Sequence, residues 1–332
     1  MSSPTNQSNV APLQEAASSP GSSGSSGGAP LAPSFATIDL LQEALSAHKY
    51  VAERGLATSI FLALKLGKPL FLEGEAGVGK TEVAKMLSAL LDAPLIRLQC
   101  YEGLDVNAAL YEWNYARQTL HLRLLEASGA SREEMEASIF TRRFLQARPL
   151  LDAIEQSATG KTPVLLIDEV DRADEEFEAL LLELLSDFQI TIPELGTITT
   201  STPPVVIITS NRTREVHDAL KRRCLYYWIE YPSFQKELQI VRLKAPQIEP
   251  MLARQMTAFI QELRTMELFK APGVAETIDW TAAIVALDQQ ELTLDVIQET
   301  IGVILKYQDD ITSLPPGTLQ AALDRAKIRA EM

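Results

Sequence analysis

The sequence predicts an α/β fold, in which a parallel β-sheet is covered by helices on both faces and is followed by a smaller domain of helices alone. Short apolar runs recur at residues 69–72, 95–98, 164–167, 205–209 and 225–229. Continuous apolar strands separated by helical segments are typical of a parallel sheet that is buried on both faces. After Pro232 the strand pattern stops, and residues 233–332 are expected to form helices broken near proline and glycine.

The chain divides into three regions. Residues 1–34 are rich in Ser, Gly, Pro and Ala, so they bury too little apolar surface to offset the entropy lost on ordering. We expect a flexible tail in this region. Residues 35–232 are expected to form the α/β domain, and residues 233–332 the helical lid domain.

Helical patterns precede and follow the first strand. Residues 37–66 have helical periodicity, and beyond the strand the side chains Val83, Leu87 and Leu90 share one face of a helix that runs through residue 91. The long segment between the strands at 95–98 and 164–167 is not expected to be sheet.

A helix and a hairpin are predicted between the strands at 164–167 and 205–209. Apolar residues recur at helical spacing from Phe177 to Phe188, which is ordinary core packing. Ile190 and Ile192 then alternate with polar residues up to a Pro-Glu-Leu-Gly turn, and Ile198 follows among threonines. This alternation indicates a β-hairpin.

A glycine-rich segment between the first strand and the next helix, here called the phosphate loop, fits the pattern G-x-x-x-x-G-K-[ST]. Its glycines allow successive backbone N–H groups to point at phosphate oxygens. Lys80 would reach the β- and γ-phosphates, and the Thr81 hydroxyl would hold Mg²⁺. The alternative is a turn that binds nothing, which the flanking strand and helix disfavour. The loop residues are Gly74, Glu75, Ala76, Gly77, Val78, Gly79, Lys80 and Thr81.

Polar residues that suit nucleotide hydrolysis follow two later strands. Asp168 would organise the Mg²⁺ shell, and Glu169 would polarise the water that attacks the γ-phosphate. Asn211 would hydrogen-bond that water. The alternatives are a strand that simply ends in acids and a turn-forming asparagine.

A basic cluster follows the strand at 205–209 and comprises Arg212, Arg214, Lys221, Arg222 and Arg223. The ordinary interpretation is a solvated basic face. The sharper hypothesis is that an arginine here reaches the γ-phosphate held by a neighbouring subunit, where a planar guanidinium stabilises developing charge.

The composition and charge of the chain argue against several classes of protein. The net charge of −14 argues against a general nucleic-acid binder. Cys100 and Cys224 form no disulfide framework or metal-ligand spacing, and the three histidines are isolated. The sequence has no apolar run of membrane-spanning length and no basic start followed by an apolar segment, so we expect a cytoplasmic location.

Together these motifs resemble those of the AAA+ ATPases, specifically the MoxR branch, with the closest resemblance to its CoxD-like members. The resemblance covers nearly everything from residue 38 onward. Besides the phosphate loop and Asn211, it is carried by residues 165–178, 188–196 and 272–280.

This resemblance implies a P-loop NTPase αβα sandwich (the AAA+ core) with an all-α lid, assembled as a hexameric ring that binds ATP and Mg²⁺ between subunits. It implies ATP hydrolysis that drives remodelling, with a von Willebrand factor A domain protein as partner. The implied client is a metalloenzyme such as a molybdenum-containing carbon monoxide dehydrogenase or a similar hydroxylase. By motif position Arg223 corresponds to the arginine finger, with Arg222 as the alternative.

The resemblance also implies that the hairpin at 188–198 faces the pore or substrate side of the ring, although a plain connecting hairpin is an alternative. Residues 101–105 and 113–115 are a second candidate contact region if their aromatic side chains are exposed, and are core if they are buried. One departure stands out: residues 274–280 lack the arginine that many AAA+ proteins carry at the start of a lid helix.

Three other classes of function fit the phosphate loop alone. A GTPase would usually carry an Asn-Lys-x-Asp motif, which the sequence lacks, and a small-molecule kinase belongs to the same class of alternatives. A scaffold would use nucleotide only to assemble. A DNA-linked AAA+ motor would need a locally basic pore within an acidic protein.

Overall fold

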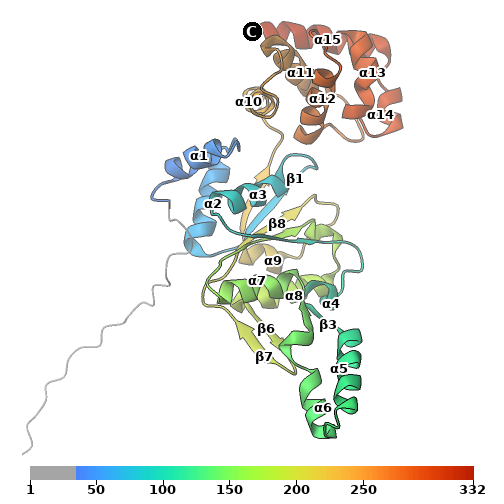
Figure 1. The fold of residues 1–332 in the computed structure, drawn as a ribbon. Coiled ribbons are helices and arrows are strands. Elements are labelled where there is room, and N and C mark those ends of the chain that lie inside the picture. Colours follow the sequence, from blue (N-terminus) through green and yellow to red (C-terminus); the bar gives the residue numbers. More distant parts are fainter. Residues whose placement is uncertain (1–34) are drawn as a thin grey trace, which may run out of the picture.

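The computed structural model describes residues 35–332, and the predicted tail lies outside them. Its centre is a parallel five-stranded sheet with strand order β2-β5-β8-β1-β9 (Figure 1). The five strands lie where the sequence predicts them, so the α/β prediction is confirmed. Their bounds are β1 (Leu70–Gly74), β2 (Leu95–Gln99), β5 (Val164–Asp168), β8 (Val205–Ser210) and β9 (Leu225–Ile229).

Each face of the sheet has its own apolar core. Successive strand residues point to opposite faces, so Leu70 and Leu72 of β1 join one core while Phe71 joins the other. The first core contains α1 (Ile38–Ala47), α2 (Arg54–Leu66) and α3 (Lys80–Leu90). The second contains α7 (Pro149–Ala158), α8 (Glu175–Asp187) and α9 (Asp218–Arg223). Burial on both faces explains why these strands are apolar throughout.

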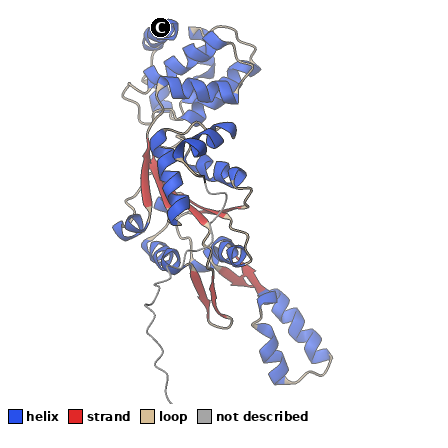
Figure 2. Cartoon of the chain, turned by 90° about the vertical axis from the view of Figure 1, so that its left-hand side faces the viewer, coloured by secondary structure: helices blue, strands red, loops and turns tan. Residues whose placement is uncertain are grey.

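The segment between β2 and α7 projects from the α/β domain (Figures 1 and 2). It does not join the central sheet, but it contains a small antiparallel ribbon in which Tyr111 pairs with Ala147. The helices α5 and α6 extend beyond this ribbon. The elements are α4 (Val106–Ala109), β3 (Tyr111–Trp113), α5 (Tyr115–Ala127), α6 (Arg132–Ile139), η1 (Arg142–Phe144) and β4 (Leu145–Ala147).

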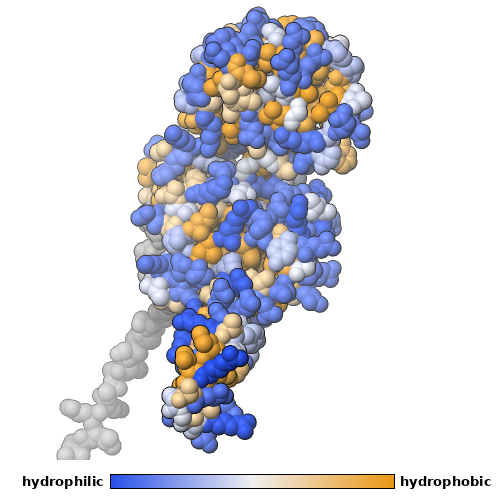
Figure 3. Space-filling model, turned by 45° about the vertical axis from the view of Figure 1, so that its right-hand side comes forward, coloured by the Kyte–Doolittle hydropathy of each residue, from blue (hydrophilic) through white to orange (hydrophobic). Residues whose placement is uncertain are grey.

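The aromatic residues of this projection are divided between core and surface. Trp113 is buried, whereas Tyr101 and Tyr115 are exposed. Leu120 and Leu124, one helical turn apart on α5, are 60% and 62% exposed. Figure 3 shows hydrophobic residues among hydrophilic ones on this end of the molecule. Only part of the predicted contact region is therefore available to a partner.

The predicted hairpin is present. The short η2 (Val170–Arg172) and α8 precede it, and β6 (Gln189–Ile192) pairs with β7 (Gly196–Thr199). Ile190 and Ile192 are buried against the second core, which explains their alternation with polar residues.

The C-terminal part is all helical and has a core of its own, in which Trp280 packs against Phe259. Its buried residues include none from the sheet. The six helices are α10 (Phe234–Lys244), α11 (Pro250–Leu263), α12 (Val274–Ala286), α13 (Leu294–Ile304), α14 (Gln308–Thr312) and α15 (Pro316–Glu331). Among residues 35–332, no helix has the length and apolarity needed to cross a membrane.

Candidate active site

The phosphate loop requires glycine at specific points. A Cβ on Gly74 would lie 2.3 Å from the carbonyl oxygen of Ile229 in the neighbouring strand β9. Gly77 and Gly79 have φ values of +78° and +96°, which L side chains rarely adopt. Gly79 is the N-cap of α3, so the chain leaves a buried strand and enters a helix over five residues. This is the strand–loop–helix arrangement that the sequence predicts.

Lys80 begins α3 and bends back over the loop. Its Nζ donates to the carbonyl oxygens of Gly74 at 2.7 Å and Glu75 at 2.6 Å. Burial lowers the pKa of Lys80 to about 8, although nearby carboxylates including Asp171 and Glu75 partly oppose this shift. The ammonium is thus held at the loop in a dehydrated setting, where it interacts more strongly with a phosphate than it would in bulk water.

Asp168 lies at the end of β5 and faces α3. The Thr81 hydroxyl donates to its Oδ1 at 3.0 Å, and the Thr209 hydroxyl donates to the same atom at 2.6 Å. Arg97 of β2 donates to Oδ2 at 2.6 Å. The structure therefore brings Thr81 and Asp168 together, as predicted. Hydroxyl and carboxylate oxygens are the ligands that Mg²⁺ prefers, so these two residues fit a magnesium ion.

Glu169 is the first residue after β5 and has a φ of +56°. Its carboxylate accepts hydrogen bonds from Gln99 at 3.1 Å and Asn211 at 3.2 Å. It also forms an ion pair with Arg172 at 3.0 Å. The predicted pair of Glu169 and Asn211 is thus in direct contact, because β5 and β8 are neighbours in the sheet.

Three residues of this network do not stand out in the sequence, namely Arg97, Gln99 and Thr209. Arg97 and Gln99 alternate with apolar residues on the edge strand β2, where they reach Asp168 and Glu169 respectively. The alternation of polar and apolar residues is visible in the sequence. It points to the site only once β2 is known to lie beside β5.

Asp171 supports the loop that carries Asn211. It is buried and accepts hydrogen bonds from the Asn211 N–H at 3.1 Å, the Thr213 N–H at 2.8 Å and the Thr213 hydroxyl at 2.6 Å. Burial opposes ionisation of Asp171, but the hydrogen bonds from Thr213 and Asn211 outweigh it, so its pKa lies below the usual value.

The predicted basic cluster separates into inward and outward members. Lys221 forms an ion pair with the buried Glu73 of β1, and Arg214 pairs with the buried Glu178 of α8. Arg222 and Arg223 instead lie near the exposed end of α9.

The two outward arginines differ in their contacts. Among residues 35–332, the side chain of Arg222 pairs only with Asp218 of its own helix, at 3.6 Å, and it is 81% exposed. Arg223 donates to the Ser186 hydroxyl at 2.9 Å. Within residues 35–332 neither arginine forms a hydrogen bond or ion pair with the acids around Lys80.

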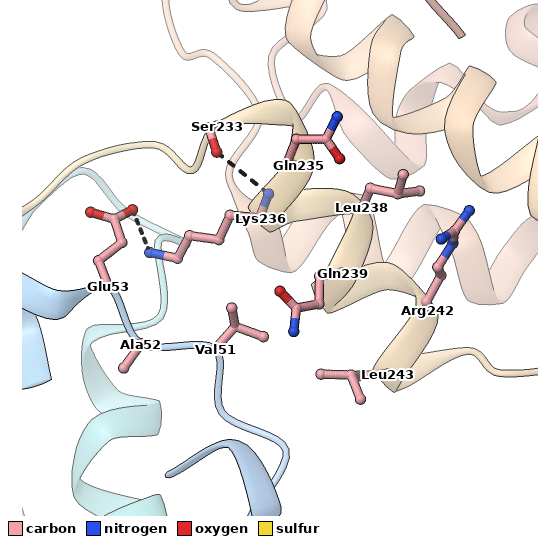
Figure 4. Close-up of a pocket in the computed structure, with 10 residues that line it drawn as sticks. All are labelled: Val51, Ala52, Glu53, Ser233, Gln235, Lys236, Leu238, Gln239, Arg242 and Leu243. Carbon is pink, nitrogen blue, oxygen red and sulfur yellow. Dashed lines mark hydrogen bonds and ion pairs between the residues drawn. The ribbon is translucent and has the colours of Figure 1, made fainter. Parts of the chain in front are cut away.

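A cavity of about 800 Å³ lies between the segment before α2 and the first lid helix α10 (Figure 4). Lys236 crosses this junction and pairs with Glu53 at 2.9 Å. Val51, Leu238 and Leu243 supply an apolar part of the lining. This cavity could not be predicted from the sequence, because its walls come from residues 51–53 and 233–243, which lie far apart in the chain.

The parallel sheet and the phosphate loop after β1 form a P-loop NTPase fold of the AAA+ type. Residues 69–224 match the family model described as "AAA domain (dynein-related subfamily)", and this span runs from the start of β1 to the end of α9. The chain therefore contains an AAA domain. It binds ATP with Mg²⁺ and hydrolyses ATP.

The chain is similar to uncharacterized proteins of staphylococci. It is 24% identical over 254 residues to one from Staphylococcus haemolyticus, covering 74% of this chain and 86% of that protein. It is 24% identical over 256 residues to one from Staphylococcus epidermidis, covering 74% and 87%. Among solved structures it is similar to the RuvB Holliday junction branch migration motor of Thermotoga maritima. That comparison has 17% identity and a TM-score of 0.43, and covers 85% of this chain and 75% of the other.

Proposed function

We propose that this ATPase is a remodelling chaperone of the MoxR type, with its closest kinship to CoxD-like members. Its ATP hydrolysis would drive a change in another protein. In this proposal six copies form a ring in the cytoplasm, a von Willebrand factor A domain protein is the partner, and the client is a metalloenzyme of the carbon monoxide dehydrogenase or molybdenum hydroxylase type. The support for MoxR kinship is the set of sequence motifs described above.

The observation that carries the proposal is the separation of the acids from the outward arginines. Lys80 lies close enough to Asp168 and Glu169 for their charges to interact, whereas Arg222 and Arg223 lie on an exposed helix end. An arginine that stabilises the transferred phosphoryl group can be supplied by another subunit. The separation of the acids from the exposed arginines favours an ATPase site that is shared between copies of the chain, and hence a ring.

Each residue has a role in the proposed mechanism. Backbone N–H groups of the phosphate loop and the Lys80 ammonium bind the β- and γ-phosphates. Thr81 and Asp168 would hold Mg²⁺, which neutralises phosphate charge when it is bound. Glu169 accepts the proton of the attacking water, and Asn211 orients that water. Arg223 of the neighbouring subunit, or Arg222 beside it, stabilises the charge that develops on the γ-phosphate.

Two surfaces are proposed to contact other proteins. The β6–β7 hairpin would face the substrate side of the ring. The α5–α6 projection, with its exposed Tyr115, Leu120 and Leu124, is positioned away from the lid and from the ATP site (Figure 1).

The proposal is tested by capturing the Glu169→Gln variant with ATP, because a ring that binds but does not hydrolyse should retain its partner. We expect a von Willebrand factor A domain protein or a metalloenzyme in the captured material, and neither with Lys80→Ala, which should not bind ATP. Wild-type turnover should also rise when the captured partner is added back. The proposal is contradicted if the protein remains a monomer in the presence of ATP. It is also contradicted if the rate of ATP turnover does not change when the partner is added.

A further inference from the structure

The lid helix α12 begins directly on the phosphate loop. The Ala275 N–H donates to the carbonyl oxygen of Gly77 at 3.1 Å. The first N–H groups of a helix have no partner within that helix, so an outside acceptor is needed. Here the acceptor is the phosphate loop of the other domain. The loop therefore acts as part of the N-terminal cap of α12.

Gly273, the residue before α12, makes this approach possible. A Cβ on Gly273 would lie 2.8 Å from the Ala76 carbonyl oxygen and 2.9 Å from the Gly77 Cα. The Glu276 carboxylate, which accepts from the Gly273 N–H at 2.9 Å, also lies beside both glycines. The two backbones are thus in contact at a point where any other residue would have to push them apart.

This contact orients a phosphate-binding group. In a planar trans peptide the C=O of Gly77 and the N–H of Val78 point in opposite directions. The hydrogen bond from Ala275 holds the Gly77 C=O toward the lid, so the Val78 N–H is held on the other side of the peptide. Backbone N–H groups of such loops are what bind phosphate oxygens.

A buried ion pair holds the lid side of the contact in place. Arg264 donates to both carboxylate oxygens of Glu237, at 2.6 and 2.7 Å, and its Nε donates to the Pro272 carbonyl oxygen at 2.7 Å. The Thr277 hydroxyl donates to the same Glu237 at 2.7 Å. Glu237 is fully buried, so the turn at Pro272–Gly273 is fixed to the lid core.

We propose that Gly273 is a positioning residue of the ATPase site, and that the lid is coupled to bound nucleotide by direct backbone contact with the phosphate loop. A nucleotide that orders the loop also fixes the start of α12, and displacement of α12 turns the Val78 N–H away from the phosphates. This contact supplies the coupling in a lid whose residues 274–280 include no arginine.

Gly273→Ala tests the proposal, with Gly302→Ala as its control. A Cβ at Gly302, on α13 of the same lid, meets no atom within 4 Å. We expect Gly273→Ala to raise the Kd of a fluorescent ATP analogue about tenfold, since a misplacement of about 1 Å can cost about 10²-fold and the shift needed here is smaller. Gly302→Ala should retain the wild-type Kd. Wild-type Kd and kcat in a folded Gly273→Ala protein would overturn the proposal.

A second measurement uses the wild-type chain, and it tests the proposed coupling between lid and phosphate loop even if the alanine variant does not fold. Hydrogen exchange of the peptide covering residues 273–277 should slow when a non-hydrolysable ATP analogue binds, because the Ala275 N–H becomes more firmly bonded to Gly77. The start of α13, capped within the lid by Thr293, should exchange at an unchanged rate. Equal exchange at residues 273–277 with and without nucleotide would overturn the proposal.

Discussion

The acidic end of the sheet and the basic end of α9 are both parts of the proposed ATPase site, yet their polar groups are satisfied in different ways. Glu169 has three donors from its own chain, Gln99, Asn211 and Arg172. Arg222 is 81% exposed, and in the described part of the chain its side chain makes only a long ion pair within its own helix.

Buried or half-buried charges need partners to offset their loss of hydration, whereas exposed charges do not. The acids are consequently fixed by their own fold. The exposed arginine end remains available to a surface outside the chain. In the proposed ring, each copy would contribute the acids from its own fold and would present its arginines to a neighbouring copy.

The largest expected effect is a loss of ATP turnover when an acid of the site, Glu169, is replaced. Glu169→Gln should keep ATP binding, because the amide can still accept a hydrogen bond from Asn211 or Gln99. It should lower kcat by about 10³-fold or more, since the group that accepts the proton of the attacking water is lost. Steady-state turnover and equilibrium binding of labelled ATP measure the two quantities. Full hydrolysis by this variant would refute the role of Glu169.

The basic side is tested by Arg223→Ala and Arg222→Ala, made separately. The variant that removes the arginine acting in trans should lose about 10³-fold in kcat with little change in ATP affinity. The other arginine variant serves as the control, since the two side chains are adjacent but have different contacts.

Mixed rings give the discriminating result for the arginine. Arg223→Ala subunits keep an intact Glu169, and Glu169→Gln subunits keep an intact Arg223. Turnover should therefore return when the two are mixed. Absence of rescue at every ratio, for both arginine variants, would contradict an arginine that acts between subunits.

A smaller effect is expected where the chain supports its own acidic half. Asp171→Asn replaces an oxygen that accepts N–H bonds with an amide that cannot accept at both positions. It should lower the free energy of unfolding by about 2 kcal/mol. Urea unfolding measures this loss, and the exposed Asp187→Asn should change stability by less than about 0.5 kcal/mol. Equal midpoints for the two variants would show that Asp171 does not hold the Asn211 loop.

The stabilisation by Asp171 should also depend on pH. Its pKa is lowered in the folded protein, so its contribution is present above the ordinary carboxyl range and is lost as the pH falls through the folded-state value. The stability difference between wild type and Asp171→Asn should therefore narrow in acid.

The smallest expected effect concerns the pH dependence of ATP binding. With a pKa of about 8, Lys80 loses its proton above that pH, and phosphate binding must then restore it. The Kd for ATP should rise about tenfold between pH 7 and pH 9. Lys80→Arg is the control, because a guanidinium stays protonated in this range. An equal rise for both proteins would place the titration elsewhere.

Ionisation of Lys80 affects folding stability in the opposite direction to ionisation of Asp171. Its pKa is lowered on folding, so the buried ammonium destabilises the protein at neutral pH. This destabilisation fades as the pH rises from about 8 toward the ordinary lysine value.

Much of the fold and of the nucleotide-binding half could be predicted from the sequence, because local pattern carries the information. Residues 74–81 specify their own turn through glycine and their own chemistry through Lys80 and Thr81. Continuous apolar strands require burial on both faces, and an acid at the end of such a strand must lie at the sheet edge. Asp168 and Glu169 could be assigned for that reason.

Only the tertiary structure decided which distant segments meet. Arg97 and Gln99 became part of the site because β2 lies beside β5 in the sheet, an order that sequence patterns do not encode. The antiparallel pairing of β3 with β4 joins two three-residue strands, which are too short for a periodic signal. The sequence predicted a phosphate loop at residues 74–81 between a strand and a helix, and the structure contains that arrangement. The packing of the lid on the core decided that Gly273 touches this loop, because contact between two backbones depends on how whole domains fit together.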